Sequence, residues 1–286
     1  MIAFLIKAIA IVGPTASGKT ALSLSLAERF SGEIVSCDSM QIYREMSVGT
    51  AKATDEERAM APHHLIDFLS PNESYSADNY RADALLAVED ITSRRKLPIF
   101  VGGTGLYMDS LIRGNEFAPF PSTGMREKLE TQADEQGMEA MLDLLRSIDP
   151  ASAARLHLSD RKRIIRALEV YYETGETITA HNLRTQAIPP KYDPVWFCLD
   201  FTDRANLYSR IDLRVSLMLE QGLVAENKFN LSKTYIIYRY NRALVRKANT
   251  TDESILSLLR NENQELAEEN FVPHCDVYFV STCMEE

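Results

Sequence analysis

The sequence lacks the features that identify several large classes of protein. Its four cysteines form no Cys-x-x-Cys pair and show no zinc-ligand spacing, which favours a reduced, cytoplasmic setting. No apolar run reaches the roughly 18 residues that a spanning helix requires, so we expect no membrane partner. The formal net charge is −10. No overall basic field therefore indicates nucleic acid, although a local basic groove can lie on an acidic protein.

The apolar pattern that is present indicates an α/β protein. Short apolar runs predict strands at 8–13, 33–38, 96–107 and 194–201, with helical patterns after the first run and at 76–95 and 203–225. Such alternation predicts a parallel sheet whose sites lie at the carboxyl ends of the strands. Segment 114–190 carries only helical patterns. We therefore expect a discontinuous core over 1–113 and 191–226, a helical insertion over 114–190, and an atypical tail over 227–286.

Residues 13–20, "GPTASGKT", match the phosphate-loop pattern Gly-x-x-x-x-Gly-Lys-[Ser/Thr] between a predicted strand and a predicted helix. Glycines allow the backbone to curl so that several N–H groups converge on one phosphate. The lysine adds a positive charge, and the final hydroxyl can bind Mg²⁺. The motif predicts a di- or triphosphate site in a P-loop NTPase-like core without identifying the ligand. Its residues are Gly13, Pro14, Thr15, Ala16, Ser17, Gly18, Lys19 and Thr20.

A P-loop ATPase normally holds Mg²⁺ with a second motif, an apolar strand that ends in an acidic residue. The sequence has little trace of such a motif. Only Asp38, at the end of the predicted strand 33–38, approaches that description. Its carboxylate could belong to a metal shell, serve as a structural N-cap, or act as a general base aimed at a substrate beside the phosphate. The residues alone leave these three alternatives open.

Five stretches together resemble the bacterial tRNA dimethylallyltransferases, also called tRNA isopentenyltransferases. They are "GPTASGKT", "IVSCDSMQIYREMSVGTAK", "APHHLIDFLSPNESYSADNYRADA", "PIFVGGTGLY" and "DRKRIIRALEVYYETG", in family order over about 8–226. The resemblance implies a monomeric, cytoplasmic enzyme that uses Mg²⁺ and dimethylallyl diphosphate. It implies transfer of the prenyl group to N6 of the adenosine 3′-adjacent to the anticodon, in tRNAs that read codons beginning with U.

The resemblance also implies roles for individual residues. Thr15 to Thr20 would bind the diphosphate, with Thr20 next to Mg²⁺, and Arg214 would contact the leaving pyrophosphate. Asp38 would accept a proton from, or form a hydrogen bond with, the attacking N6 amine. The residues implied to contact tRNA are Asp38, Ser39, Met40, Gln41, Thr104, Arg126, Lys162, Arg163, Ile164, Ile165 and Arg166. In the predicted helix 160–174, Ile164 and Ile165 also belong to an apolar face.

After Glu226 the sequence departs from the family pattern, and segment 228–270 resembles part of the N-terminal regulatory region of anaerobic ribonucleotide reductases. The departure predicts weaker tRNA binding than in an intact relative, and leaves turnover open. Two alternatives therefore stand beside the transferase. A small-molecule or nucleotide kinase carries a similar phosphate loop. A truncated remnant would bind RNA or nucleotide without turnover.

Overall fold

The computed structural model describes residues 5–114 and 123–226. The chain divides into two compact units. Among the described residues, the α/β unit comprises 5–108 and 193–226, and the helical unit comprises 109–114 and 123–192. The predicted tail over 227–286 lies outside the described residues. No helix in the described ranges is long and apolar enough to cross a membrane.

The α/β unit is built on a five-stranded sheet with the order β3-β2-β4-β1-β5. Strands β1, β4, β2 and β3 pair in parallel, and Ile99 of β4 lies opposite both Ile9 and Ile34. All five residues of β2 are buried, as expected of a parallel strand covered on both faces. The strands are β1 (Ile6–Val12), β2 (Gly32–Ser36), β3 (His63–His64), β4 (Leu97–Val101) and β5 (Tyr192–Cys198).

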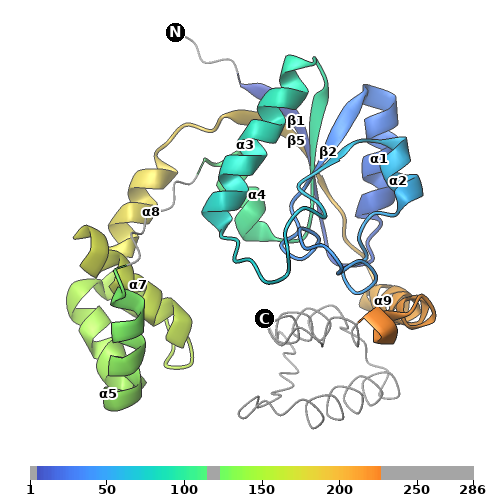
Figure 1. Ribbon diagram of the computed structural model, residues 1–286. Coiled ribbons are helices and arrows are strands. Elements are labelled where there is room, and N and C mark those ends of the chain that lie inside the picture. Colours follow the sequence, from blue (N-terminus) through green and yellow to red (C-terminus); the bar gives the residue numbers. More distant parts are fainter. Residues whose placement is uncertain (1–4, 115–122, 227–286) are drawn as a thin grey trace. The chain divides into compact units, whose positions relative to one another are not determined.

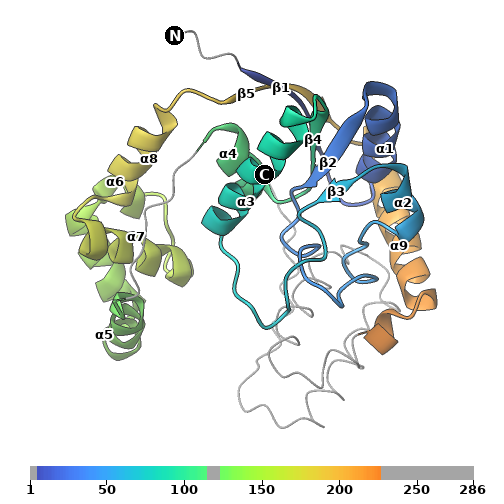
Figure 2. The same ribbon diagram turned by 45° about the horizontal axis from the view of Figure 1, so that its top comes forward.

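Helices cover both faces of this sheet. Helix α1 (Lys19–Phe30), with α2 (Asp55–Met60) beside it, lies on one face and α3 (Ala77–Ser93) on the other (Figure 1). Helix α3 begins at a capping box, in which Ser76 and Asn79 exchange side-chain-to-backbone hydrogen bonds. Figure 2 shows α9 (Arg204–Glu220) on the same side of the unit as α1 and α2. The carboxyl ends of the central strands are thus left accessible between helices.

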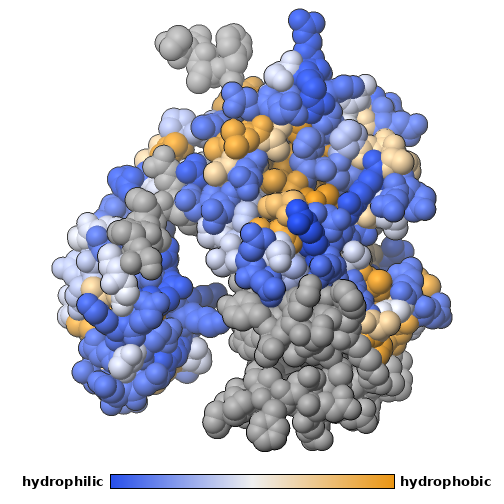
Figure 3. Space-filling model, in the orientation of Figure 1, coloured by the Kyte–Doolittle hydropathy of each residue, from blue (hydrophilic) through white to orange (hydrophobic). Residues whose placement is uncertain are grey.

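The helical unit has its own core. Its helices are α5 (Met125–Ile148), α6 (Pro150–Ala153), α7 (Arg161–Thr174) and α8 (Ile178–Gln186), and α4 (Gly105–Ile112) spans the boundary between the units. Helix α5 is kinked at Gly137, whose φ of 83° is non-helical. In the view of Figure 3 the surface of this unit is mostly hydrophilic. The core therefore lies inside, and its buried members include Leu129, Met141, Leu145, Ile164, Ile165 and Leu168.

The α/β class, the four strands and the helices at 76–95, 160–174 and 203–225 were predicted from the sequence. Four elements were not: α2, β3, α4 and α8. Each is short, from two to nine residues, so none carries three full periods of an apolar pattern. The helical unit begins at Asp109 and ends at Tyr192, against a predicted insertion over 114–190.

Candidate active site

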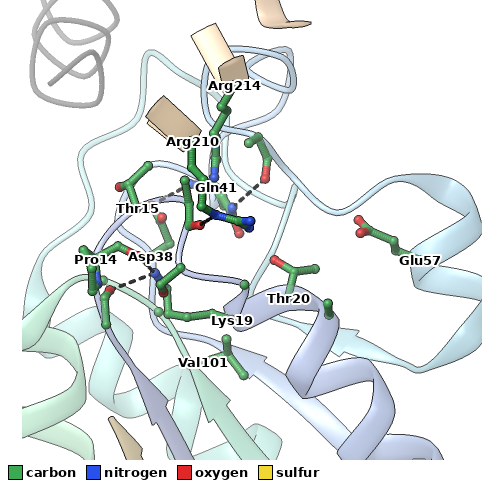
Figure 4. Close-up of a pocket in the computed structure, with 18 of the residues that line it drawn as sticks. Pro14, Thr15, Lys19, Thr20, Asp38, Gln41, Glu57, Val101, Arg210 and Arg214 are labelled. Carbon is green, nitrogen blue, oxygen red and sulfur yellow. Dashed lines mark hydrogen bonds between the residues drawn. The ribbon is translucent and has the colours of Figure 1, made fainter. Parts of the chain in front are cut away.

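A cavity of about 660 Å³ lies in the α/β unit at the carboxyl ends of β1, β2 and β4. This is where a parallel α/β sheet places its ligands. The phosphate loop, Asp38 and one face of α9 surround the cavity (Figure 4). Its lining comprises 13–21, Asp38, Gln41, Ala51, Glu57, 101–103, Arg210, Leu213, Arg214 and Leu217.

The phosphate loop is shaped for an anion. Gly18 precedes α1 with a φ of 94°, and no side chain caps the helix. The first amide N–H groups of α1 are therefore available to a ligand at the positive end of the helix. The hydroxyl of Ser17 is buried and has no hydrogen-bond partner among the described residues. Lys19 Nζ folds back over the loop and donates to the carbonyl oxygens of Gly13 and Pro14, at 2.8 and 2.7 Å.

Asp38 follows β2 and lines the cavity. Its Oδ1 accepts hydrogen bonds from the backbone N–H groups of Met40, at 2.8 Å, and Gln41, at 3.4 Å. The carboxylate therefore caps the turn that follows it, which was one of the open alternatives. This role does not exclude chemistry, because the same side chain also faces the cavity.

The turn after β4 fixes this loop in place. Gly102 lies so close to β2 that a Cβ atom there would stand 2.1 Å from the carbonyl oxygen of Cys37. Two residues later, Thr104 Oγ1 accepts a hydrogen bond from the N–H of Ser39 at 3.0 Å, and its own N–H donates to the Cys37 carbonyl at 3.1 Å. Thr104 therefore supports the loop that carries Asp38, and its predicted contact with tRNA stays a prediction.

The three residues after Asp38 differ in position. Gln41 lines the cavity, and its Nε2 donates to the carbonyl oxygens of Thr50 and Ala51, at 3.2 and 3.0 Å. Met40 packs against a buried cluster that includes Ile42 and Met218. Neither Met40 nor Ser39 belongs to the cavity lining.

Helix α9 brings two arginines to the cavity, one helical turn apart. Arg214, which was predicted, is half-buried, and its Nε has no hydrogen-bond partner within the described ranges. Burial lowers the pKa of the Arg214 guanidinium, and the negative charge of Asp38 opposes that effect. Arg210, which was not predicted, donates from Nε to the carbonyl oxygen of Ala16 at 2.9 Å. The exposed side chains of Leu213 and Leu217 complete this face.

The basic residues predicted to contact tRNA belong to the helical unit, and the structure separates them into two groups. Lys162 and Arg163 are exposed on α7. Arg126 and Arg166 instead share Glu169, with nitrogen–oxygen distances of 2.8 and 2.9 Å. Burial lowers the pKa of Arg166, while that carboxylate acts in the opposite sense.

Two members of the same prediction need correction. The side chains of Ile164 and Ile165 are 0 % and 1 % exposed, because they pack into the core of the helical unit. They cannot present a side chain to RNA without unfolding α7. The apolar-face interpretation of these two residues is correct.

Several cavity residues were missed by sequence reasoning. Arg210, Leu213 and Leu217 share the i, i+3, i+4, i+7 spacing with Arg214, and this spacing could have identified them once α9 was aligned with the site. Glu57 comes from the short helix α2, and no sequence signal connects it with the phosphate loop. The need for glycine at position 102 could be recognised only in the structure, from its close approach to the backbone that follows β2.

Comparison with known proteins places this geometry in a family. The sequence profile of IPPT, described as IPP transferase, matches residues 41–268. The chain belongs to the IPP transferase family. The profile match extends past Glu226 to residue 268, and the atypical tail over 227–286 stays a prediction.

Relatives in the IPP transferase family support the assignment. The chain is 47% identical over 224 residues to "tRNA dimethylallyltransferase 2" of Geotalea uraniireducens, covering 77% of this chain and 71% of that protein. It is 42% identical over 253 residues to the tRNA dimethylallyltransferase of Acetivibrio thermocellus, covering 88% and 79%. The crystal structure of the tRNA isopentenylpyrophosphate transferase of Bacillus halodurans is similar, with a TM-score of 0.58 and 36% identity over 92% of this chain and 84% of that one.

Proposed function

We propose that this protein transfers a dimethylallyl group from dimethylallyl diphosphate to N6 of the adenosine 3′-adjacent to the anticodon, in tRNAs that read codons beginning with U. Diphosphate is the second product. The observation that carries the proposal is the placement of a phosphate loop and the carboxylate of Asp38 on one cavity, in a chain of the IPP transferase family.

The phosphate loop suits the leaving group of such a donor. As the bond between the prenyl carbon and the diphosphate oxygen breaks, negative charge grows on the diphosphate and must be stabilised. The uncapped start of α1, Lys19 and the two arginines of α9 supply positive potential around one cavity. The buried, unpartnered hydroxyl of Ser17 can donate to a phosphate oxygen.

Mg²⁺ fits this site only together with a diphosphate. The described residues contain no group of three or more His, Cys, Asp or Glu side chains that could hold a metal. Mg²⁺ keeps several waters and is commonly bound by one or two protein oxygens plus substrate phosphates. Thr20, which lines the cavity at the start of α1, would supply the protein oxygen. The ion would neutralise charge on the diphosphate.

Asp38 would activate the acceptor. The N6 amine of adenine is a weak nucleophile, because its lone pair is delocalised into the ring. A carboxylate that accepts one N6 proton as the nitrogen–carbon bond forms removes the positive charge that would otherwise develop. The capping hydrogen bonds from Met40 and Gln41 hold the Asp38 side chain in one orientation.

Recognition of tRNA would use both units. Reaching N6 requires the adenosine to leave the anticodon stack, and the cavity would receive it beside Asp38. Lys162 and Arg163, exposed on α7, would contact phosphates of the anticodon stem-loop and so position the RNA. Arg126 and Arg166 would also contact the RNA, and their shared ion pairs with Glu169 would hold the two side chains together on one face.

A labelling experiment with the full chain tests the proposal. The protein is incubated with Mg²⁺, labelled dimethylallyl diphosphate and unmodified tRNA, beside an RNA in which guanosine replaces the target adenosine. We expect label only in the first RNA, and loss of labelling in Asp38→Asn. Consumption of ATP without RNA labelling would overturn the proposal in favour of a kinase. Binding of both substrates without turnover would indicate a remnant.

A further inference from the structure

A hydrogen bond joins the phosphate loop to α9. Arg210 Nε donates to the carbonyl oxygen of Ala16 at 2.9 Å, across 194 positions of sequence. The guanidinium also lies over the ring of Phe201, 5.8 Å from its centroid, which keeps the side chain extended along the start of α9. Arg210 lines the cavity beside the loop that it contacts (Figure 4).

The residue that receives this bond has an unusual backbone. Ala16 has a φ of 64°, in the left-handed region that alanine rarely occupies. Its methyl group packs against the cluster formed by Ile211 and Val215 of α9. Helix α9 therefore holds Ala16 twice, by an apolar contact and by a charged hydrogen bond.

The conformation of Ala16 determines where the loop points. Ser17 and Gly18 follow it directly, and α1 begins at Lys19. Rotation of Ala16 into an ordinary conformation would redirect the N–H groups that should converge on a phosphate. An unstrained phosphate loop needs no support from a distant helix. A strained one binds tightly only if something else maintains it.

We propose that Arg210 is a positioning residue for the diphosphate site: by holding the Ala16 carbonyl, it keeps the phosphate loop in its binding conformation. The identity of the ligand rests on the proposed function, but the positioning role does not. The role differs from that of Arg214, which would contact the leaving group itself. It also makes the loop and α9 one rigid element, so that the cation of Arg214 keeps a fixed position relative to the loop.

One variant at each end of the bond, alone and combined, separates this role from direct contact with the ligand. Glycine adopts the left-handed conformation without strain, so Ala16→Gly removes the need for the support. If Arg210 acts through Ala16, Arg210→Gln should weaken binding alone and have little effect when combined with Ala16→Gly. If Arg210 contacts the diphosphate directly, Arg210→Gln should weaken binding by the same factor with and without Ala16→Gly. Ala16→Gly alone measures the loss of the methyl contact.

The experiment measures the Kd of Mg²⁺ with inorganic pyrophosphate for the full-length protein by titration calorimetry. We expect Arg210→Gln to raise the Kd about tenfold, the size of a lost hydrogen bond to a charged donor, and the double variant to return within about threefold of Ala16→Gly. Arg204→Gln, an exposed arginine of α9 outside the cavity, is the matched control and should bind as the parent does. A tenfold loss that persists in the double variant overturns the proposal.

Hydrogen exchange gives a readout that needs no ligand. Amide exchange at Ser17, Gly18 and Lys19 should accelerate in Arg210→Gln and stay at the parental rate in Arg204→Gln. Unchanged exchange in Arg210→Gln would overturn the positioning role even if the Kd rises. Failure of the parent to bind pyrophosphate would contradict the proposed function, while the exchange result would still decide the role of Arg210.

Discussion

Asp38, at the end of β2, and Arg214, on α9, line one cavity and interact electrostatically. Two opposite charges are thereby held on the same half-buried surface. They suit the two ends of the proposed transfer, since one group must accept a proton while the other meets growing negative charge.

Asp38→Asn should abolish most turnover while preserving the loop. The asparagine side-chain oxygen can still accept from the N–H groups of Met40 and Gln41, but the amide cannot take the N6 proton. We expect kcat to fall by about 10² to 10⁴, with affinity for pyrophosphate kept or slightly increased because a negative charge is gone. Single-turnover prenylation and calorimetry measure the two effects. Parental kcat in this variant would exclude Asp38 as the base.

Gly102→Ala should displace the loop that carries Asp38. The new methyl group would stand 2.1 Å from the Cys37 carbonyl oxygen, and this neighbour is backbone in the core of the sheet. We expect a loss of about 1–3 kcal/mol in the free energy of unfolding, with reduced kcat. Gly103→Ala is the matched stability control, since a Cβ there meets nothing within 4 Å. Equal unfolding midpoints for the two variants would contradict the close approach.

Neutralising Lys162 and Arg163 should weaken the binding of tRNA without affecting the binding of the prenyl donor. Both side chains are exposed on α7, so the double change to glutamine should leave folding intact. We expect a higher KM for tRNA, an unchanged KM for dimethylallyl diphosphate, and a salt dependence of binding reduced by about two charges. Arg146→Gln, which removes an arginine from α5 instead of α7, is the control. A donor KM that rises with the tRNA KM would argue against phosphate contacts.

Ile164→Ala, in the same segment, should behave differently. Because this side chain is fully buried in the helical unit, its truncation should cost about 2–5 kcal/mol of unfolding free energy. Urea unfolding measures the loss directly. A variant with parental stability but weak tRNA binding would restore the original prediction that Ile164 contacts RNA.

Glu33→Gln should make stability less dependent on pH. Bidentate contact with Arg94 and a hydrogen bond from His64 lower the pKa of this buried carboxyl from 4.5 to about 2. A lowered folded-state pKa adds stability that is fully present above pH 4.5 and is lost as pH falls through about 2. The stabilisation is at most about 3 kcal/mol. The difference in unfolding free energy between parent and variant should therefore shrink from pH 7 towards pH 2.5; a constant difference would contradict it.

The sequence predicted those parts of the site that a local pattern encodes. The phosphate loop, Thr20 and Asp38 follow predicted strands, so their placement at one sheet edge could be derived before any contact was known. Arg210 could not be found this way, because its role depends on the left-handed backbone of Ala16. Glu57 reaches the cavity from a helix too short to predict. Ile164 and Ile165 were assigned two roles, and only packing could decide between them.

The order of the strands has a consequence for the distance over which the chemistry must act. Strand β4 lies between β1, which leads into the phosphate loop, and β2, which leads to Asp38. Neighbouring strands are about 4.8 Å apart, so the phosphate loop and the segment that carries Asp38 leave the sheet roughly 10 Å from each other. Main-chain hydrogen bonds between the strands fix this spacing. Surface loops can change in evolution without altering this spacing. A prenyl donor must therefore fit the distance between the phosphate loop and Asp38.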